Sequence, residues 1–304
     1  MPPKKVVVTG GSGRVGRYVL ENLAEIFQVR NADLAPALTG AGGRPPAEAE
    51  FVKTDVLDLD DVRAALAGAD AVVHLAAIDF DWKAPAEDYI RVNTLGTWNV
   101  LQAAEENGLD RAVLCSSVSA CGLSEMRPDW APQYLQVDEE HELRPVQAYS
   151  LSKQIMETMG QAVARGSHMS VVALRPLAVV LPETLAEFTG FVDDPELRWL
   201  YYYIEASDLA RAFRAALESE VDGFDAFFIS ADDTCHPEPT LAWYPRVAGE
   251  ETPPHDPAVF TANPRASVFS SARAKERLGW SPTSNFLEMR AAAGLPLPDP
   301  TPAN

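Results

Sequence analysis

The stretch VVVTGGSGRVG, residues 6–16, decides the fold of this chain. Its β-branched residues Val6, Val7 and Val8 are typical of a buried strand, and a glycine-rich turn follows them directly. Beyond the turn, apolar side chains recur at the spacing of one helix face. A strand that passes through such a turn into a helix is the context in which glycines hold a dinucleotide.

Each glycine of this turn has a predicted task. Gly10 permits the tight bend, Gly13 lets a pyrophosphate approach the backbone, and Gly16 allows close packing of the helix on the strand. The helix that begins here has Arg14 and Val15 in its first turn and offers unpaired N–H groups to phosphates. The turn therefore predicts nucleotide binding.

A second strand, predicted over residues 26–34, ends at Asp33. A carboxylate about 20 residues past the glycine turn accepts hydrogen bonds from the ribose hydroxyls of the adenosine, and it repels the 2′-phosphate of NADP. NAD is therefore favoured, while Arg14 and Arg30 keep NADP open as an alternative. A solvated turn residue is the other interpretation of Asp33.

The rest of the chain alternates strands with helices, which predicts an α/β fold with a doubly wound parallel sheet of the Rossmann type. Further strands are predicted over residues 51–56, 71–77, 111–117, 170–176 and 225–230, and helices over 59–67, 85–107, 146–165, 206–218 and 271–278. Residues 1–180, with 200–231 returning to them, are predicted to form the dinucleotide-binding domain, and residues 181–199 and 232–304 a small substrate-binding lobe.

Composition narrows the classes of function. With 44 acidic against 25 basic residues the net charge is −19, which argues against nucleic acid as a partner. No apolar run is long enough to span a membrane, and MPPKK leads too quickly into a strand for a signal peptide, so a cytoplasmic location is expected. The three cysteines and five histidines show no metal-ligand spacing, so no metal site is predicted, and His74 is interpreted as a packed strand histidine.

Tyr149 and Lys153 carry the predicted chemistry. They lie four residues apart on a helix, hence on one face. A lysine ammonium beside a phenol lowers the pKa of the phenol, so Tyr149 can take a proton from an alcohol as hydride leaves for NAD⁺. Ser117, at the end of the fifth strand, is expected to hydrogen-bond the same substrate oxygen, and Asn93 to order backbone or water on the proton path.

This series of motifs resembles the extended short-chain dehydrogenases/reductases, the superfamily of nucleotide-sugar epimerases, dehydratases and uronate dehydrogenases. The matching segments are TGGSGRVG (9–16), DV (55–56), HLAA (74–77), VNTLGTWNVLQAA (92–104), SSVSACG (116–122), YSLSK (149–153), ALRP (173–176), EASDLARAFRAALE (205–218) and SARAKERLGWSP (271–282). The resemblance implies Ser117, Tyr149 and Lys153 as the catalytic residues. The predicted NAD contacts are Gly10, Gly13, Arg14, Val15, Gly16, Asp33, Asp55, Val56, Leu75, Ala76, Ala77, Asn93, Tyr149, Lys153 and Pro176.

The departures from the epimerase pattern favour the branch that resembles uronate dehydrogenases. Cys121 stands where epimerases carry a tyrosine, and no asparagine follows Arg175 and Pro176. The segment 181–204, which grips the nucleotide diphosphate in epimerases, is short and acidic, with Arg198 as its sole basic residue. The segments HLAAI (74–78) and QVRNADL (28–34) also look like that branch.

Two side chains are predicted to bind substrate in addition to Ser117 and Tyr149. The resemblance places Ser119 where a substrate-binding side chain projects, and it places Arg175 where a guanidinium can clamp a carboxylate bidentately. The alternative for Arg175 is an arginine tied to structure. Trp82, Trp199 and Tyr201–Tyr203 either line the pocket or, as the favoured interpretation, form aromatic core.

Family resemblance also implies a homodimer, built from the helices at 85–107 and 146–165. Apolar residues on these helices suit either that interface or the core of the sheet; they are Leu95, Trp98, Leu101, Ile155 and Met159.

Together these features predict an NAD-dependent oxidoreductase that oxidises a secondary alcohol or hemiacetal of a sugar, sugar acid or small polyol. A nucleotide-sugar epimerase with tightly bound NAD is the alternative. A non-catalytic NAD-sensing protein is disfavoured, because such proteins lose the Tyr/Lys pair that this chain keeps.

Overall fold

The central sheet has seven parallel strands. They are β1 (Lys5–Thr9), β2 (Gln28–Asp33), β3 (Glu50–Lys53), β4 (Ala71–His74), β5 (Arg111–Cys115), β6 (Ser170–Pro176) and β9 (Phe224–Ile229), in the spatial order β3-β2-β1-β4-β5-β6-β9. A separate pair is formed by β7 (Val179–Val180) and β8 (Ile204–Glu205). The computed structural model describes residues 4–44, 46–80, 84–127, 129–194, 199–249 and 252–297. The predicted doubly wound parallel sheet is confirmed.

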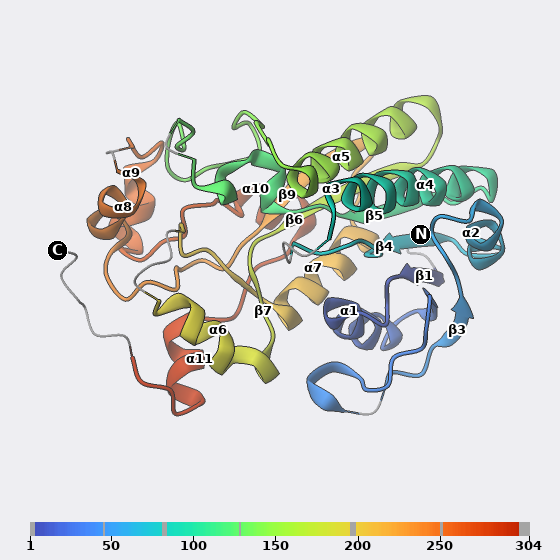
Figure 1. Cartoon of the computed structure of the whole chain (residues 1–304), viewed down its shortest axis with the longest axis horizontal. Helices are drawn as coiled ribbons and strands as arrows, with labels where there is room; N and C mark the ends of the chain where they lie inside the picture. Colours follow the sequence, from blue (N-terminus) through green and yellow to red (C-terminus); the bar gives the residue numbers. More distant parts are fainter. Residues whose placement is uncertain are drawn as a thin grey trace.

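Helices cover both faces of this sheet (Figure 1). They are α1 (Arg14–Ala24), α2 (Leu59–Leu66), α3 (Ala86–Asp88), α4 (Gly96–Glu106), α5 (Ala148–Gly166), α6 (Leu185–Val192), α7 (Ala206–Glu218), α8 (Thr240–Ala248), α9 (Pro257–Ala262), α10 (Ala272–Leu278) and α11 (Phe286–Ala292). One apolar cluster joins the sheet to α1 and α7, and another joins it to α2, α4 and α5. The alternation of side chains along β1 explains this, since Val6 and Val8 belong to the first cluster and Val7 to the second.

The strand order reverses between β1 and β4, because β2 and β3 extend from one side of β1 while β4 begins the other side. Such a switch leaves a crevice outside the carboxyl ends of the two strands, where open α/β sheets bind ligands. The two ends are held together, since the Leu75 amide donates to the Thr9 carbonyl at 3.0 Å. The glycine turn after β1 therefore faces the residues that follow β4.

The helix predicted over residues 85–107 differs from the structure. It consists of α3, a π-helical turn at Tyr89–Leu95, and α4. A π-turn closes hydrogen bonds to the fifth residue rather than the fourth, so a pattern read at 3.6 residues per turn does not reveal it. The predicted strands 51–56, 71–77 and 111–117 also end earlier, because the chain leaves the sheet at the crevice.

Short helices in the second half of the chain were missed by the sequence analysis. One helix was expected in the proline-rich tail, yet α8, α9 and α11 accompany α10, and α6 lies in the segment 181–204. These missed helices are six to nine residues long, too short for a clear apolar period. Prolines also argue against a helix in these segments when only the sequence is considered, since Pro245 lies inside α8 and Pro257 is the first residue of α9.

A third apolar cluster gathers the segments 118–137, 177–203 and 228–295. It contains Trp199, Tyr202 and Tyr203, all buried, so the favoured interpretation of these residues as aromatic core is confirmed. Trp82 and Arg198 lie outside the described residues. The proposed division into a dinucleotide-binding domain and a small lobe stays a prediction.

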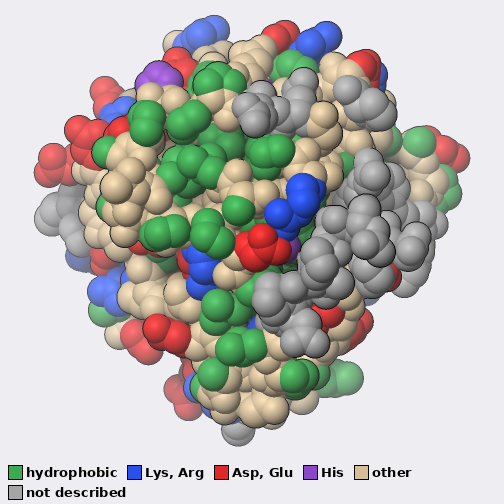
Figure 2. Space-filling model, turned by 90° about the vertical axis from the view of Figure 1, so that its left-hand side faces the viewer, with side chains coloured by type: hydrophobic (Ala, Val, Ile, Leu, Met, Phe, Trp, Pro, Cys, Tyr) green, Lys and Arg blue, Asp and Glu red, His purple; other side chains and the backbone are tan. Residues whose placement is uncertain are grey.

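The side of the molecule that carries α8 and α9 is drawn in Figure 2. Hydrophobic side chains gather in the middle of this face, and most charged side chains surround them. In the described part of the chain, no helix has the length and apolarity that a membrane span requires.

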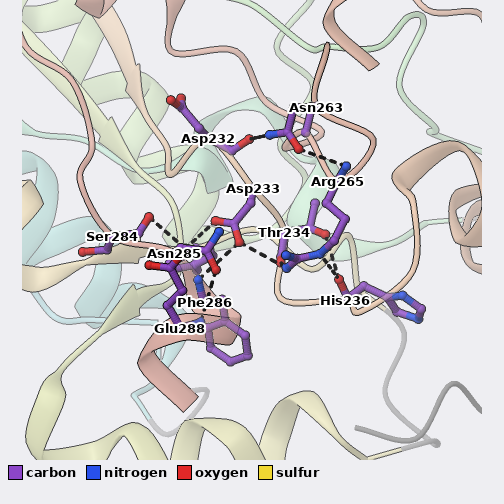
Figure 3. Close-up of polar contacts among 12 residues, drawn as sticks. Asp232, Asp233, Thr234, His236, Asn263, Arg265, Ser284, Asn285, Phe286 and Glu288 are labelled. Atoms are coloured by element: carbon purple, nitrogen blue, oxygen red, sulfur yellow. Dashed lines mark hydrogen bonds and ion pairs between the residues drawn. The ribbon is translucent and has the colours of Figure 1, made fainter. Parts of the chain in front are cut away.

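Asp233 joins three segments of the C-terminal half (Figure 3). It is 4% exposed, and its carboxylate accepts hydrogen bonds from the Tyr203 hydroxyl at 2.5 Å, the Arg265 guanidinium at 3.1 Å and the Phe286 amide at 3.2 Å. A buried carboxylate with this many donors fixes the relative position of the chains that supply them.

We expect Asp233→Ala to lower the free energy of unfolding by about 2–4 kcal/mol, because it leaves buried donors without their acceptor. The neighbouring Asp232→Ala serves as the matched control. It removes an exposed ion pair with Lys275 and keeps the backbone carbonyl that Asn263 binds, so a loss of about 0–1 kcal/mol is expected. Urea denaturation measures both, and equal losses in the two variants would contradict the role given to Asp233.

Candidate active site

The glycine turn has the shape that a pyrophosphate site requires. Gly10 adopts a left-handed φ of +72°, and a Cβ on it would lie 2.5 Å from the Ala76 nitrogen. A Cβ on Gly16 would collide with the Gly10 carbonyl, so this glycine packs the helix against the turn itself. At Gly13 the nearest obstacle would be the Gly10 carbonyl at 3.2 Å, which leaves the approach from outside comparatively open.

The first turn of α1 is free to receive an anion. Its N-cap, Gly13, has no side chain to cap the helix, and no acidic residue lies in the first turn. Uncapped N–H groups and the positive end of the helix dipole favour a phosphate at this position. The residues present therefore fit a dinucleotide.

Asp33 ends β2 beside this turn. Its carboxylate accepts from the Ser12 amide at 2.9 Å and from the Leu34 amide at 2.7 Å, which fixes it at the mouth of the crevice. The alternative role of Arg30 as a ligand of the NADP phosphate is wrong. Arg30 is buried in β2 and donates to Glu50 and to the carbonyls of Ala65 and Ala67.

Asp55 and Val56, predicted to contact the cofactor, follow β3. The Asp55 carboxylate accepts from the Leu57 amide at 2.9 Å and so shapes its own turn. Val56 is buried, and its carbonyl accepts from the Asn99 side chain at 2.9 Å.

Asn93 lies in the π-helical turn and is fully buried. Its side-chain oxygen accepts from the Ile78 amide at 2.8 Å, and its nitrogen donates to the Ile78 carbonyl and the Ser152 hydroxyl, each at 3.1 Å. Asn93 thus orders backbone, one of the two roles expected of it. It holds the chain after Leu75–Ala77 next to α5, which carries Tyr149.

Tyr149 lies in the first turn of α5 and is 6% exposed. The Ser117 side chain lies beside its phenol, and the Phe80 and Tyr89 rings pack against its ring, with centroids 5.2 and 5.9 Å away. The Lys153 ammonium lies 5.6 Å from the centre of the Tyr149 ring. The three predicted catalytic residues are therefore brought together.

The protonation of this centre differs from the expectation. Burial raises the pKa of Tyr149, and the Asp79 carboxylate raises it further, while the hydrogen bond from Ser117 opposes them. Burial also lowers the pKa of Lys153, whose ammonium donates to the Cys115 carbonyl at 2.8 Å. In the protein alone, Lys153 does not bring the phenol pKa toward neutrality, because the desolvation of the phenolate outweighs it.

Ser119 stands beside Ser117 at the end of β5. The Ser119 amide donates to the Ser117 hydroxyl at 3.1 Å, and the Ser124 hydroxyl donates to the Ser119 hydroxyl at 2.9 Å. The Ser119 and Ser124 hydroxyls therefore lie next to Ser117, and the predicted substrate role of Ser119 stays a prediction.

Arg175, predicted to bind a substrate carboxylate bidentately, is already bound by a carboxylate of this chain, Glu157. Its Nε and Nη2 donate to Glu157 at 2.9 and 2.7 Å, and the two side chains are only 5% and 6% exposed. Ser116 donates to the same carboxylate at 2.5 Å. The prediction of a bidentate substrate clamp is corrected, and the alternative of a structural arginine holds. The neighbouring Pro176 ends β6 and is buried against β9.

His74 is a packed strand histidine, as interpreted from the sequence. Its ring nitrogens hydrogen-bond Thr9 at 2.7 Å and Thr97 at 3.0 Å. Burial, followed by the charge of Lys153, lowers the pKa of His74 to about 3, so the ring is neutral.

Sequence reasoning missed the second layer of this centre. Asp79 and Phe80 reach Tyr149 from the loop after β4, and Glu157 pairs with Arg175 from α5. Glu157 lies four residues after Lys153 on the same helix, and that spacing is the signal that could have found it. The loop residues carry no such periodic signal.

Comparisons with known proteins agree with this geometry. Residues 6–194 match the NAD dependent epimerase/dehydratase family. The chain is 32% identical over 185 residues to the N-acetyl-alpha-D-glucosaminyl-diphospho-ditrans,octacis-undecaprenol 4-epimerase of Escherichia coli O157:H7, covering 59% of this chain and 48% of that protein. It is 34% identical over 158 residues to the uronate dehydrogenase of Agrobacterium fabrum, covering 52% of this chain and 55% of that protein. The matched region thus spans about half the length of each relative.

A solved structure shows the same fold. It is a short-chain dehydrogenase/reductase superfamily protein from Agrobacterium tumefaciens with bound NAD, with a TM-score of 0.70 and 23% identity over 95% of each chain. The family match covers more than half of this chain and agrees with the cofactor predicted from the glycine turn. The chain therefore belongs to the NAD dependent epimerase/dehydratase family, as an enzyme of the extended short-chain dehydrogenase/reductase type.

Proposed function

We propose that this enzyme is a dehydrogenase that oxidises a secondary alcohol or hemiacetal of a sugar, sugar acid or small polyol. The observation that carries the proposal is that Ser117, Tyr149 and Lys153 gather at the crevice beside the glycine turn, with the Lys153 ammonium 5.6 Å from the centre of the Tyr149 ring. A phenol and a serine hydroxyl that lie side by side can both reach one substrate oxygen.

In the proposed reaction, Ser117 donates a hydrogen bond to the substrate oxygen, and ionised Tyr149 takes its proton. The carbinol C–H bond breaks at the same time, and a carbonyl forms as hydride departs. Bound NAD⁺ supplies the hydride acceptor and a positive charge that favours the phenolate. Lys153, held by the Cys115 carbonyl, adds a second positive charge near the phenol. The products are the carbonyl compound, NADH and a proton.

The relatives support two reaction classes at sugar carbons, dehydrogenation and 4-epimerisation. The segment 181–204 favours the dehydrogenase because it is short and acidic, with Glu183 and Asp193 already paired with Arg17 and Arg290 and Glu187 adding a further negative charge against a nucleotide diphosphate. An epimerase regenerates its cofactor within each cycle, so it retains NAD on purification.

The deciding assay follows NADH absorbance with NAD⁺ and a panel of aldoses, uronates, amino sugars and polyols. NADH formation on a free sugar or sugar acid supports the dehydrogenase. If no compound of the panel yields NADH and the purified protein carries bound NAD, the epimerase becomes the supported function.

Tyr149→Phe is expected to lower kcat/KM by about 10²- to 10⁴-fold, because the general base is lost while the ring and its packing remain. NAD binding, measured by calorimetry, should persist. Tyr134→Phe is the matched control, since its phenol bonds Asp138 away from the centre and its loss should leave the rate nearly unchanged. Near-normal turnover of Tyr149→Phe would contradict the proposed base.

The preference for NAD over NADP is proposed to rest on Asp33. Asp33→Asn removes the negative charge that repels the 2′-phosphate, so the ratio of kcat/KM for NAD to that for NADP should fall by about tenfold. The exposed Asp60→Asn carries the same charge change beyond β3 and should leave the ratio unaltered. An unchanged ratio in Asp33→Asn would assign the preference to other residues.

We also propose a homodimer across α5, α4 and the π-helical turn that precedes α4, because apolar side chains remain exposed there. Leu95, Trp98 and Leu151 are 45%, 44% and 38% exposed. Leu101 does not contribute, since it is fully buried in the core.

Trp98→Glu should convert the dimer to a monomer, as measured by light scattering, because a charge would enter the apolar interface. Ile26→Glu replaces an apolar side chain that is 53% exposed at the end of α1, and it should leave the dimer intact. A wild-type monomer would refute the proposed interface.

A further inference from the structure

We propose that His74 is a positioning residue of the reaction, which holds Asn93 through Thr97 and so fixes Tyr149 relative to the loop after β4. The inference rests on the proposed dehydrogenase function and concerns the site of that reaction. In this role His74 acts through a chain of buried hydrogen bonds and not on substrate or cofactor directly.

The hydrogen bond between Thr97 and Asn93 fixes the proton on the His74 ring. The Asn93 carbonyl accepts from the Thr97 hydroxyl at 2.6 Å, which uses the one proton of that hydroxyl. The Thr97 oxygen also lies 3.0 Å from His74 Nε2, so Nε2 must be the donor of this second hydrogen bond. Because the low pKa of His74 keeps its ring neutral, Nδ1 is left as the acceptor for the Thr9 hydroxyl at 2.7 Å.

The chain of hydrogen bonds continues from Asn93 to the helix that carries Tyr149. The Asn93 side-chain nitrogen donates to the Ser152 hydroxyl at 3.1 Å, and this hydroxyl donates to the Tyr149 carbonyl at 2.6 Å. All donors therefore point the same way, from the end of β1 to the first turn of α5. A fully satisfied buried chain of this kind holds its members in one arrangement. Its side chains upstream of Tyr149 are all fully buried; they are Thr9, His74, Asn93, Thr97 and Ser152.

The Thr97 hydroxyl acts at the point where the helix is widened. Thr97 lies in the first turn of α4, and Asn93 lies in the π-helical turn before it. A threonine that bonds the carbonyl four residues earlier bends a helix. Asn93 also accepts from the Ile78 amide, two residues before Phe80, whose ring packs 5.2 Å from that of Tyr149. Release of the Thr97 hydroxyl would therefore loosen both the backbone of Tyr149 and the packing on its ring.

Thr97→Val removes the hydroxyl and keeps the volume of the side chain. We expect kcat for a sugar or polyol that yields NADH to fall by about 10-fold, because a small displacement at a reacting centre slows the chemical step strongly. The KM for NAD⁺ should stay close to the wild-type value, since the glycine turn is untouched.

Thr240→Val is the matched control. The Thr240 hydroxyl is equally buried and also donates to a carbonyl at 2.6 Å, that of Ala266, at the start of α8. Both variants should lower the urea midpoint to a similar extent, and only Thr97→Val should lower kcat. This difference separates positioning from a general loss of stability.

Two replacements of His74 separate the roles of its ring nitrogens. A glutamine amide reaches the position of Nε2, whereas an asparagine amide reaches that of Nδ1. His74→Gln therefore keeps a donor for Thr97 and should retain most of kcat. His74→Asn keeps only an acceptor for Thr9 and should lose as much of kcat as Thr97→Val.

A measurement that does not depend on activity follows the ring itself. In protein labelled with ¹⁵N-histidine, the NMR signals that disappear in His74→Gln belong to His74. We expect the neutral ring with its proton on Nε2 at neutral pH. A proton on Nδ1, or on both nitrogens, overturns the proposed chain.

The outcomes separate the two proposals. Wild-type kcat in Thr97→Val and His74→Asn, or an equal loss of kcat in Thr97→Val and Thr240→Val, overturns the positioning role and leaves the dehydrogenase intact. If no compound of the panel yields NADH, the dehydrogenase is overturned, and the positioning role for its reaction falls with it.

Discussion

The close approach of the glycine turn to the residues after β4 is the constraint on which the site depends. A Cβ on Gly10 would lie 2.5 Å from the Ala76 nitrogen, so only glycine lets the two strand ends meet. That contact aligns the first turn of α1 with the loop that carries Asp79 and Phe80. The cofactor crevice and the position of the loop that packs on Tyr149 are therefore set by one backbone contact.

A buried ion pair gives the other side of the centre its rigidity. Arg175 on β6 and Glu157 on α5 lock together, and Ser116 at the end of β5 joins them. Three elements thereby meet at one carboxylate directly behind Ser117 and Lys153. The paired charges cost desolvation, which their mutual hydrogen bonds offset. Their effect is to hold β5, β6 and α5 together behind Ser117 and Lys153.

The sequence predicts the sheet and the residues that gather at the crevice, Ser117, Tyr149 and Lys153, because both rest on local patterns. Glycines between a strand and a helix, a carboxylate at a strand end, and a tyrosine and lysine one helical turn apart can all be recognised along the chain. The partner of a buried charged side chain does not follow from the residues near it in the sequence. Arg175 binds Glu157 rather than a substrate because β6 faces α5, and this arrangement cannot be read from nearby sequence. Arg30 likewise donates to acceptors that lie in distant segments of the chain. The phenol pKa depended on burial, which no spacing reveals.

The π-helical turn at Tyr89–Leu95 makes the geometry around Tyr149 depend on how many residues this segment contains more than on which residues they are. Asn93 reaches Ile78 on one side and Ser152 on the other only because the helix is locally widened. Each residue of a regular helix turns the chain by about 100°. Loss of one residue here would restore regular winding and rotate the amide of Asn93 away from both partners. Insertions and deletions in this short segment would therefore uncouple the loop after β4 from α5 even where every side chain of the centre is kept.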